Sequence, residues 1–536
     1  MVQAIYINNR ISKHSGFVRA LLILILFAAI AQFASFGIIQ AHVISFYGAQ
    51  PEDISFAFQI AYVGIISTLP IMFRLIKYFN TQSYLLTAFL TGILLNIGCL
   101  FVHDLVLFSV LRFLIGVITC IIAGCLLIVI FTTLPESNRM LVGVSLFFSL
   151  TLTGGLIVGI GASRVIQSTN WTALYYGLIG LQIMAILLCI VMFKSRPVWK
   201  PYPLYQIDWA GYILCVFGAA AAAFVMIYGP KRYWFADATI RNAAIFAVVM
   251  LAIFLFRQAS LKRPLIDLSV FRSGKFIFAL LLMVLFFGIK DSINLIYGYS
   301  ASVLGWSSAD VVNAGLFNIA GVITATYIAV KVILAKKQNL PMLLLAGFAV
   351  MLFYHVWVYM RLTPDLSFAE LCIPIFYQGF ACGLLFVPIT IFCMASVPQS
   401  TGMTGIIICT YARFIASLNS IAGFYTLQLN YNQQFKESFL GKLIPESAAL
   451  SQRQELYKGL LASKGYTPGE ATGISNMLIA RSSGIQSQLL TIRAIFLIAA
   501  IVMAIVLAIL LFFAVINKIK AARVTGKIKS SAKPPL

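Results

Sequence analysis

The sequence predicts an all-α membrane protein that crosses the bilayer about fourteen times. Of its 536 residues, 61% are hydrophobic and only 10% are charged, whereas a soluble domain carries about 25% charged residues. Apolar runs of about 20 residues, the length that spans a bilayer as a helix, recur from Leu21 to Ile516. Because these runs do not alternate with polar residues, they favour helices over a β-barrel.

Charged or turn-rich gaps set the boundaries of the predicted spans. The earlier spans are 18–47, 54–73, 84–102, 105–133, 140–163, 171–193, 209–229 and 242–256. The later spans are 276–302, 311–335, 341–360, 368–396, 402–428 and 490–516. The first run is too long for a secretory signal peptide and lacks a small-residue cleavage site, so it is counted as a span.

Basic residues predict the orientation of the chain. With both termini in the cytoplasm, most Lys and Arg fall in cytoplasmic segments, and the short outside loops hold only Arg164, Lys231, Arg232, Arg241 and Arg361. This bias predicts cytoplasmic termini, and the polytopic helical character predicts an inner (plasma) membrane location. The net charge of +23 is therefore a topology signal and not evidence of nucleic-acid binding.

One long segment, 430–488, is predicted to lie outside the membrane. Leucines at 450, 456, 460 and 461 stand among polar residues there, which predicts a surface helix over 447–462. On the other side, the basic stretch from Gln258 to Lys275 separates two groups of spans. Leu111 to Gly116 in span four parallels Tyr377 to Gly383 in span twelve, a weak internal repeat of the kind found in transporters.

Three stretches together resemble the fourteen-span drug/proton antiporters of the major facilitator superfamily, the EmrB/QacA type. Arg263 to Arg272 (RPLIDLSVFR) is similar to the linker before the second half of that branch. Gly305 to Ala309 (GWSSA) is similar to a loop after span nine, and Leu111 to Gly116 (LRFLIG) to the fourth-span motif. The resemblance covers essentially the whole chain and implies that the motif arginine, Arg112, acts in proton transfer.

The resemblance also implies a division of the chain into two six-helix bundles with two extra helices between them. The expected parts are an N-tail (1–17), a first bundle (18–193), two extra helices (194–257), a linker (258–275), a second bundle (276–516) and a basic tail (517–536).

Three features depart from the pattern of the branch. The basic loop Arg74 to Phe79 lacks the usual Gly and Asp, and Ile160 stands where the fifth-span motif Gly155 to Gly161 has Pro. Span one has no carboxylate between Arg19 and Glu52, where the branch has one. These departures concern the substrate and its coupling more than the fold.

Span nine holds the strongest candidate site. An ionisable residue deep in a membrane helix is costly and therefore a functional candidate, and Lys290 and Asp291 follow about fourteen apolar residues, roughly 20 Å along the helix. Lys290, Asn294 and Tyr297 share one helical stripe that is expected to face a cavity or another helix. Asp291 is the candidate proton carrier, because no other carboxylate lies well inside a predicted span. The alternative is that Lys290 and Asp291 neutralise each other and only fix the packing.

Further polar residues in the predicted spans are weaker candidates for a substrate cavity. Arg112 and Arg413 need partners inside the membrane and either modulate a proton site or bond to backbone carbonyls. Gln40 and His42 stand in span one and Gln378 in span twelve, where polar groups also serve as contacts between helices.

These observations favour a secondary transporter: a proton-coupled exporter of drugs or other amphipathic molecules that works by alternating access, without a cofactor. The alternative is a transporter of one anionic metabolite with different or no proton coupling, since Arg112, Lys290 and Arg413 outnumber Asp291. A membrane-embedded enzyme is disfavoured, because His14, His42, His103 and His355 form no HxxH pair that could bind a metal. No nucleotide-binding GxxxxGK[ST] sequence occurs.

The expected partners are a small-molecule substrate, protons and the lipid bilayer, and no nucleic acid. The resemblance adds a periplasmic adaptor and an outer-membrane channel, with which related exporters work in bacteria that have two membranes. Segment 430–488 lies on the side where such an adaptor would bind.

Overall fold

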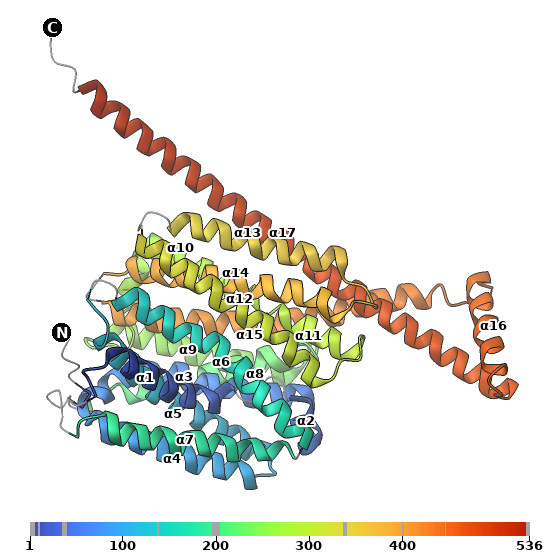
Figure 1. Cartoon of the computed structure of the whole chain (residues 1–536), viewed down its shortest axis with the longest axis horizontal. Coiled ribbons are helices and arrows are strands. Elements are labelled where there is room, and N and C mark those ends of the chain that lie inside the picture. The colour runs from blue at the N-terminus through green and yellow to red at the C-terminus, as the bar shows by residue number, and fades with distance from the viewer. Residues whose placement is uncertain are drawn as a thin grey trace.

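The computed structural model describes residues 6–8, 11–34, 40–136, 139–168, 170–195, 204–335, 340–398, 401–444 and 446–531. This part of the chain is helical, and its one β-type contact is an isolated bridge between Ile7 and Phe193. Fourteen candidate spans are long and apolar enough to cross a membrane, which confirms the predicted fold class. Figure 1 shows them packed side by side, with α1 beginning and α17 ending toward the same end of the bundle.

The helices of the first part of the chain reach as far as the linker. They are α1 (Ser15–Ala34), α2 (Gln40–Tyr47), α3 (Pro51–Tyr78), α4 (Thr81–Phe101), α5 (Leu105–Thr132), α6 (Arg139–Ser168), α7 (Leu174–Met192), α8 (Trp209–Tyr228) and α9 (Ala238–Ser260). Short 3-10 turns are η1 (Trp171–Ala173), η2 (Leu204–Gln206), η3 (Trp234–Ala236) and η4 (Leu268–Arg272), the last of which lies in the linker.

The helices of the second part follow the linker. They are α10 (Gly274–Lys290), α11 (Ile293–Ser302), α12 (Ser308–Ala335), α13 (Leu340–Arg361), α14 (Phe368–Ala395), α15 (Gly402–Leu440), α16 (Ala448–Ala462) and α17 (Pro468–Ser531).

The structure differs from the predicted spans at three places. The first span, predicted over 18–47, is described as α1 and α2, and residues 35–39 between them lie outside the described part. The ninth span is interrupted between α10 and α11. The spans predicted over 402–428 and 490–516 are the membrane parts of much longer helices, α15 and α17.

Polar side chains fix the points at which several spans begin. The side chains of Asn80, Asp104 and Asp237 accept hydrogen bonds from backbone amides in the first turns of α4, α5 and α9. Ser367 and Glu370 form a reciprocal capping box at the start of α14. Each of these satisfies amide groups that have no partner within their own helix.

Close backbone contacts between helices reveal an internal repeat. A Cβ atom built on Gly116 of α5 would lie 1.9 Å from the Ala61 carbonyl oxygen of α3, and one on Gly379 of α14 would lie 2.2 Å from the Asn318 carbonyl oxygen of α12. Since only glycine permits these approaches, α3 and α5 pack as α12 and α14 do. The structural repeat therefore relates Gly116 to Gly379, a register that differs by about three residues from the sequence comparison, which set Leu111 beside Tyr377.

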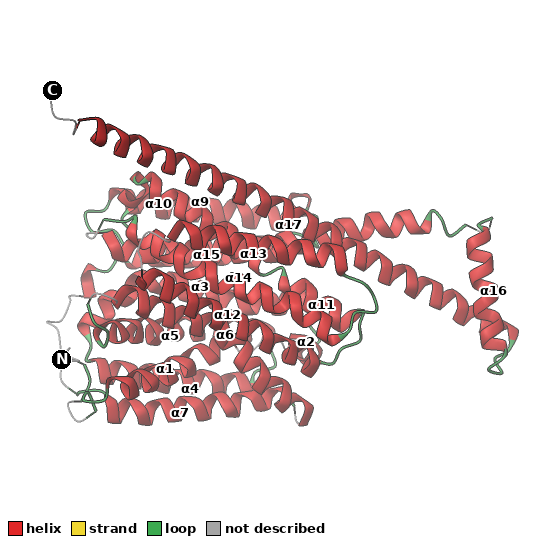
Figure 2. Cartoon of the chain, turned by 45° about the horizontal axis from the view of Figure 1, so that its top comes forward, coloured by secondary structure: helices red, strands yellow, loops and turns green. Residues whose placement is uncertain are grey.

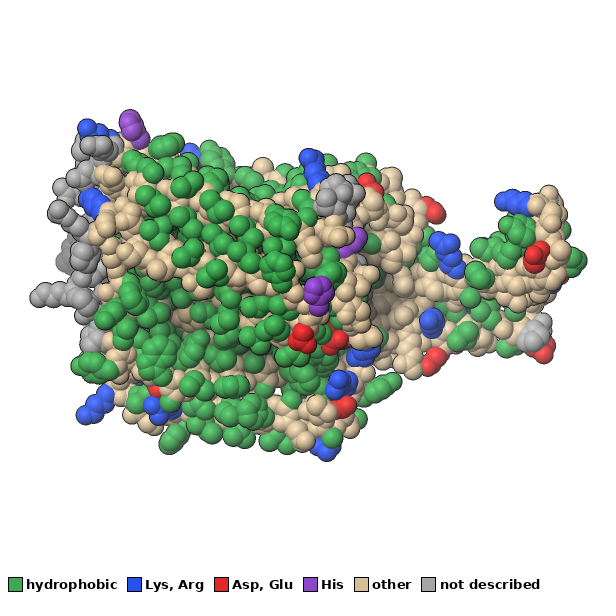
Figure 3. Space-filling view, turned by 90° about the horizontal axis from the view of Figure 1, so that it is seen from below, with side chains coloured by type: hydrophobic (Ala, Val, Ile, Leu, Met, Phe, Trp, Pro, Cys, Tyr) green, Lys and Arg blue, Asp and Glu red, His purple; other side chains and the backbone are tan. Residues whose placement is uncertain are grey.

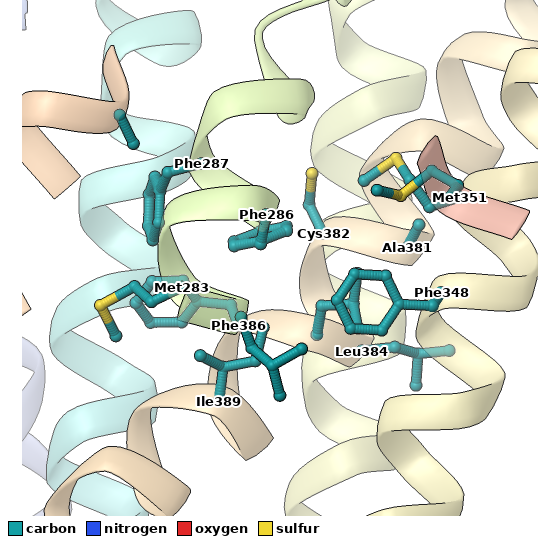
Figure 4. Close-up of a cluster of buried hydrophobic side chains, with 14 of the residues drawn as sticks. Met283, Phe286, Phe287, Phe348, Met351, Ala381, Cys382, Leu384, Phe386 and Ile389 are labelled. Carbon is teal, nitrogen blue, oxygen red and sulfur yellow. The ribbon is translucent and has the colours of Figure 1, made fainter. Parts of the chain in front are cut away.

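Apolar side chains fill the bundle and cover its outside. A cluster of Phe, Leu and Met side chains, including Met283, Phe286, Phe348 and Phe386, packs between α10, α13 and α14 (Figure 4). Figure 3 shows hydrophobic side chains over the body of the molecule, and Lys, Arg, Asp and Glu gathered toward its ends. A hydrocarbon environment accounts for this apolar exterior.

Segment 430–488 is a helical projection rather than an open loop. The end of α15, the crossing helix α16 and the start of α17 extend beyond the bundle (Figures 1 and 2). The predicted surface helix over 447–462 is confirmed as α16, none of whose side chains is buried. We call the end of the bundle that carries this structure the projection face, and the opposite end, which carries residues 258–275, the linker face.

Candidate functional site

The interruption between α10 and α11 lies in the middle of the ninth span. At the turn of Asp291 and Ser292, hydrogen bonds between residues three apart replace the α-helical bonds between residues four apart. They run from Ser292 N to Ile289 O (3.0 Å) and from Asn294 N to Asp291 O (3.0 Å). Irregular backbone inside a membrane is tolerated only where protein groups satisfy it or where it lines a cavity. Such breaks are common at the substrate and ion sites of transporters.

Lys290 and Asp291 form an ion pair at this break. Their side chains are only 21% and 20% exposed, so both charges are largely removed from solvent. The Lys290 ammonium also lies 5.6 Å from the centroid of the Phe287 ring, and the Arg413 guanidinium of α15 lies 4.6 Å from the same centroid. The site thus brings together two cations, one carboxylate and an aromatic ring that both cations contact.

Gln378 of α14 joins the break to the rest of the second half. Its side-chain amide donates a hydrogen bond to the Lys290 carbonyl oxygen (2.7 Å), which the turn leaves available. Its side-chain oxygen accepts a hydrogen bond from Asn318 of α12. Lys290, Asp291, Gln378 and Arg413, chosen as separate candidates in the sequence, therefore form one cluster contributed by α10, α14 and α15.

His355 of α13 holds the other side of the turn. It is fully buried, with Nδ1 2.8 Å from the Met351 carbonyl oxygen and Nε2 3.2 Å from the Ser292 hydroxyl. Because the carbonyl oxygen can only accept, Nδ1 carries the hydrogen. In the neutral ring, Nε2 then accepts a hydrogen bond from the Ser292 hydroxyl. The sequence analysis considered His355 only among the histidines and overlooked Ser292.

The predicted stripe of Lys290, Asn294 and Tyr297 is not continuous, because the helix is interrupted between Lys290 and the other two residues. Asn294 is exposed. The Tyr297 hydroxyl is buried and has no hydrogen-bond partner among the described residues. It lies 3.7 Å from a Cβ built on Gly315 of α12, a position that also contacts Leu156 of α6. Tyr297 therefore lies where the two halves of the chain meet.

Arg112 lies in the first half and is 1% exposed. Its guanidinium donates hydrogen bonds to the carbonyl oxygens of Gln32 (3.0 Å) and Phe33 (2.9 Å), in the last turn of α1. A cation there also interacts favourably with the negative end of the helix dipole. The carbonyl-bound arrangement, one of the two readings of the sequence, is thus present, and its relation to proton transfer stays a prediction.

A buried polar cluster beside Arg112 was not predicted as a unit. Gln32 donates to Thr119 (3.0 Å) and accepts from Gln182, which itself accepts from Asn96 (3.2 Å). These four side chains come from α1, α5, α7 and α4, and all are at most 4% exposed. Apart from the Asn96 side-chain oxygen, which has no hydrogen-bond partner among the described residues, they pair with one another as buried polar groups require, and they join four helices of the first half.

Two predicted residues, Gln40 and His42, remain. His42 lies on α2 and is exposed. Gln40 begins α2, but its side chain lies outside the described part of the structure.

Glu52 is a buried carboxylate that the sequence analysis did not select. It lies in the first turn of α3, just before the predicted span, and is 5% exposed. Its oxygens contact Lys231 and Tyr425, each at 3.1 Å.

Comparison with known proteins identifies the family. The model of the Major Facilitator Superfamily matches residues 21–423. The chain belongs to the Major Facilitator Superfamily. Since this superfamily and the relatives found are transporters, the chain is a multi-pass membrane transporter and not an enzyme.

Some relatives in the superfamily are named for export or for resistance. The chain is 25% identical over 201 residues to the multidrug export protein EmrB of Escherichia coli, an alignment that covers 36% of this chain and 38% of EmrB. It is 22% identical over 282 residues to the fatty acid resistance protein FarB of Neisseria gonorrhoeae, covering 51% of this chain and 53% of FarB. The chain thus aligns with about half or less of the length of these relatives.

Solved structures support the fold. A POT family transporter in complex with 5-aminolevulinic acid superposes with a TM-score of 0.55 at 14% identity, covering 87% of this chain and 96% of that one. A crystal structure of the peptide transporter POT gives a TM-score of 0.56 at 12% identity, covering 92% and 95%. At these identities the likeness concerns the fold alone.

Proposed function

We propose that this transporter exports amphipathic small molecules across the inner membrane by alternating access, in exchange for protons that bind at Asp291. The observation that carries the proposal is the Lys290–Asp291 ion pair at the break in span nine. A charged pair inside a membrane bundle is costly and marks a functional site by default. The names of EmrB and FarB add support for export of drugs or of amphiphiles.

The cluster offers a chemical basis for coupling. While Asp291 is ionised, it neutralises Lys290. When Asp291 takes a proton, Lys290 loses its counter-charge beside Arg413, and the affinity of the site for a charged substrate changes. Proton and substrate thus affect each other's binding reciprocally. An apolar part of the substrate would pack against the Phe287 ring, beside which both cations lie.

The charge of the substrate determines the sign of this coupling. A cationic amphiphile competes with the proton for Asp291, which gives exchange. An anionic amphiphile binds better once Asp291 is neutral, because two cations then face it. The excess of cations favours the second candidate function, transport of an anionic compound with different or no proton coupling. FarB, whose name refers to fatty acids, is consistent with an anionic amphiphile.

Proton flux in proteoliposomes tests the proposal. We would compare the wild type with Asp291→Asn, using amphipathic dyes and organic anions as substrates, and with Asp310→Asn as a matched control. Asp310 is an exposed carboxylate that accepts hydrogen bonds from Ser307 at the start of α12. We expect substrate-driven proton flux in the wild type and the control, and its loss in the folded Asp291→Asn protein.

One result would count against the proposal, and another against the anionic alternative. Substrate movement without proton flux, unchanged in Asp291→Asn, would leave a uniporter or another coupling ion and make Lys290 and Asp291 structural. A strong preference for cationic dyes that survives neutralisation of Lys290 would exclude the anionic alternative.

A further inference from the structure

The carboxylate of Glu52 joins three parts of the chain at the projection face. Glu52 belongs to α3, in the first half. One of its oxygens accepts a hydrogen bond from the Tyr425 hydroxyl of α15, in the second half, at 3.1 Å. The other oxygen pairs with Lys231, in the turn between α8 and α9, at 3.1 Å. The carboxylate is therefore satisfied from two directions although it is nearly fully buried.

The neighbouring groups attach α8 firmly to α3. Asp53 accepts a hydrogen bond from the Tyr228 hydroxyl at 2.7 Å, and Lys231 also donates to the Gln50 side chain at 3.1 Å. At the linker face, Arg74 of α3 donates to the Gln206 carbonyl oxygen just before α8 (3.2 Å). Because α8 is bonded to α3 at both ends, the two helices are expected to move together.

The contact between α3 and α15 has a different character. Below Glu52, toward the linker face, it is made by apolar and aromatic side chains: Ile60 and Val63 belong to one cluster with Phe414, and Tyr62 stacks on Phe414 with ring centroids 5.5 Å apart. Apolar surfaces of this kind can separate without breaking directional bonds. The Glu52–Tyr425 hydrogen bond is thus a directional contact across an otherwise apolar interface.

We propose that Glu52 and Tyr425 form a latch that keeps the two halves of the transporter closed at the projection face. This inference rests on the alternating access of the proposed function, but not on protons or on Asp291. Opening breaks the hydrogen bond from Tyr425, while Lys231 stays beside Glu52 because it belongs to the unit that moves with α3. The carboxylate therefore keeps a counter-charge in the open state, and the hydrogen bond from Tyr425 is the contact of Glu52 that opening removes.

The alkylation rate of a buried cysteine tests the latch. A cysteine introduced by Ile60→Cys would lie about 12 Å along α3 from Glu52, inside the apolar contact, and would react with a water-soluble maleimide only when the halves separate. The protein would be held in nanodiscs without substrate. The background reaction of the nine native cysteines, all of which are buried, would be measured in the chain without Ile60→Cys. We expect Tyr425→Phe to raise the rate about tenfold, the effect of one hydrogen bond to a charged group.

Two comparisons separate the latch from a general loosening. Tyr431→Phe removes a hydroxyl from the same helix, where the ring packs on Phe435, and should leave the rate unchanged. Glu52→Gln should raise the rate, and adding Tyr425→Phe to it should add little, because both changes act on one bond. An unchanged rate in Tyr425→Phe, or an equal rise in Tyr431→Phe, would overturn the latch. Loss of proton coupling in the Asp291 experiment would leave this result unaffected.

Discussion

At the scale of single residues, the hydroxyl of Ser292 explains how the break in span nine is held without a proline. It lies fully buried at the turn and forms a hydrogen bond with His355 on α13. Gln378 on α14 donates a hydrogen bond to the Lys290 carbonyl oxygen. The Lys290 carbonyl that the break releases is thus satisfied by a side chain of α14, while the Ser292 side chain anchors the turn to α13. Lys290 and Asp291 are positioned by contacts that are distant in sequence.

Replacing His355 tests this positioning role. We expect His355→Leu to destabilise the protein by about 1–3 kcal/mol, because it leaves the buried Ser292 hydroxyl without its acceptor. Ser292→Ala should cost less by itself and should suppress most of the effect of His355→Leu when the two are combined. Thermal unfolding in detergent would measure the changes. Equal losses for His355→Leu with and without Ser292→Ala would argue that the ring acts only by packing.

Asp208 allows a prediction of pH dependence outside the membrane. Burial alone raises the pKa of this carboxyl. Hydrogen bonds from Gly211 N (2.9 Å), Arg257 (2.8 Å) and Gln258 (3.0 Å) lower the pKa by more than burial raises it, so the net pKa lies below its ordinary value. Gln258 in turn accepts a hydrogen bond from Leu265 N. Ionised Asp208 therefore stabilises the connection between α8, α9 and the linker.

The depressed pKa fixes the sign of the effect. Unfolded Asp has a pKa of about 3.9, so the contribution of Asp208 is complete above that pH and is lost as the pH falls through the lower folded pKa. We expect Asp208→Asn to lower the melting temperature at neutral pH, and the difference from the wild type to shrink below about pH 4. Melting curves from pH 3 to pH 7 would show this. A constant difference across that range would contradict the assignment.

At the scale of helices, the spans were predictable because each needs an uninterrupted apolar run, and the number of candidate spans agrees with the prediction. The break at 291–292 was not predictable, because no proline marks it and its partners come from α13 and α14. Glu52 was missed for a simpler reason: the apolar run was counted from Ile54, although Pro51 at the start of a helix, followed by acidic residues in its first turn, is a recognised N-terminal pattern. The extended parts of α15 and α17 escaped prediction because their polar composition resembles that of a loop.

Glycine contacts between paired helices give a prediction at this scale. Gly116→Ala and Gly379→Ala should each destabilise the bundle by about 1–3 kcal/mol, because the new methyl group would overlap a backbone carbonyl that cannot rotate away. Gly180→Ala on α7, where nothing lies within 4 Å of the added Cβ, is the matched control and should stabilise by up to about 1 kcal/mol. Thermal unfolding would compare the three. If all three variants behaved alike, the close approach of the helix pairs would be refuted.

At the scale of the whole molecule, the projection is the part that lies outside any bilayer-spanning bundle. With 39 residues, α15 is about 58 Å long, well beyond a hydrocarbon core of about 30 Å. Ser487 of α17 donates to the Asn432 carbonyl oxygen of α15 (3.0 Å), and Gln454 of α16 donates to Asn476 of α17 (2.9 Å). The projection is therefore held by its own contacts, and α16 contributes nothing to the core of the bundle.

Leu456 and Leu460 carry the last prediction, which concerns a partner. They lie one turn apart on α16 and are 58% and 55% exposed. Water-exposed leucines at this spacing form an apolar stripe that a second helix can cover. If a periplasmic adaptor binds the projection, changing both leucines to Ser should reduce its recovery in a pull-down by about tenfold or more, since burying two leucine side chains contributes about 3 kcal/mol. Transport in proteoliposomes should stay unchanged, because α16 buries no side chain.

Lys458→Ser, on the same helix between the two leucines, is the matched control and should keep full recovery. Unchanged recovery in the double variant would count against an adaptor at this surface, and lost transport would instead tie α16 to the transport cycle.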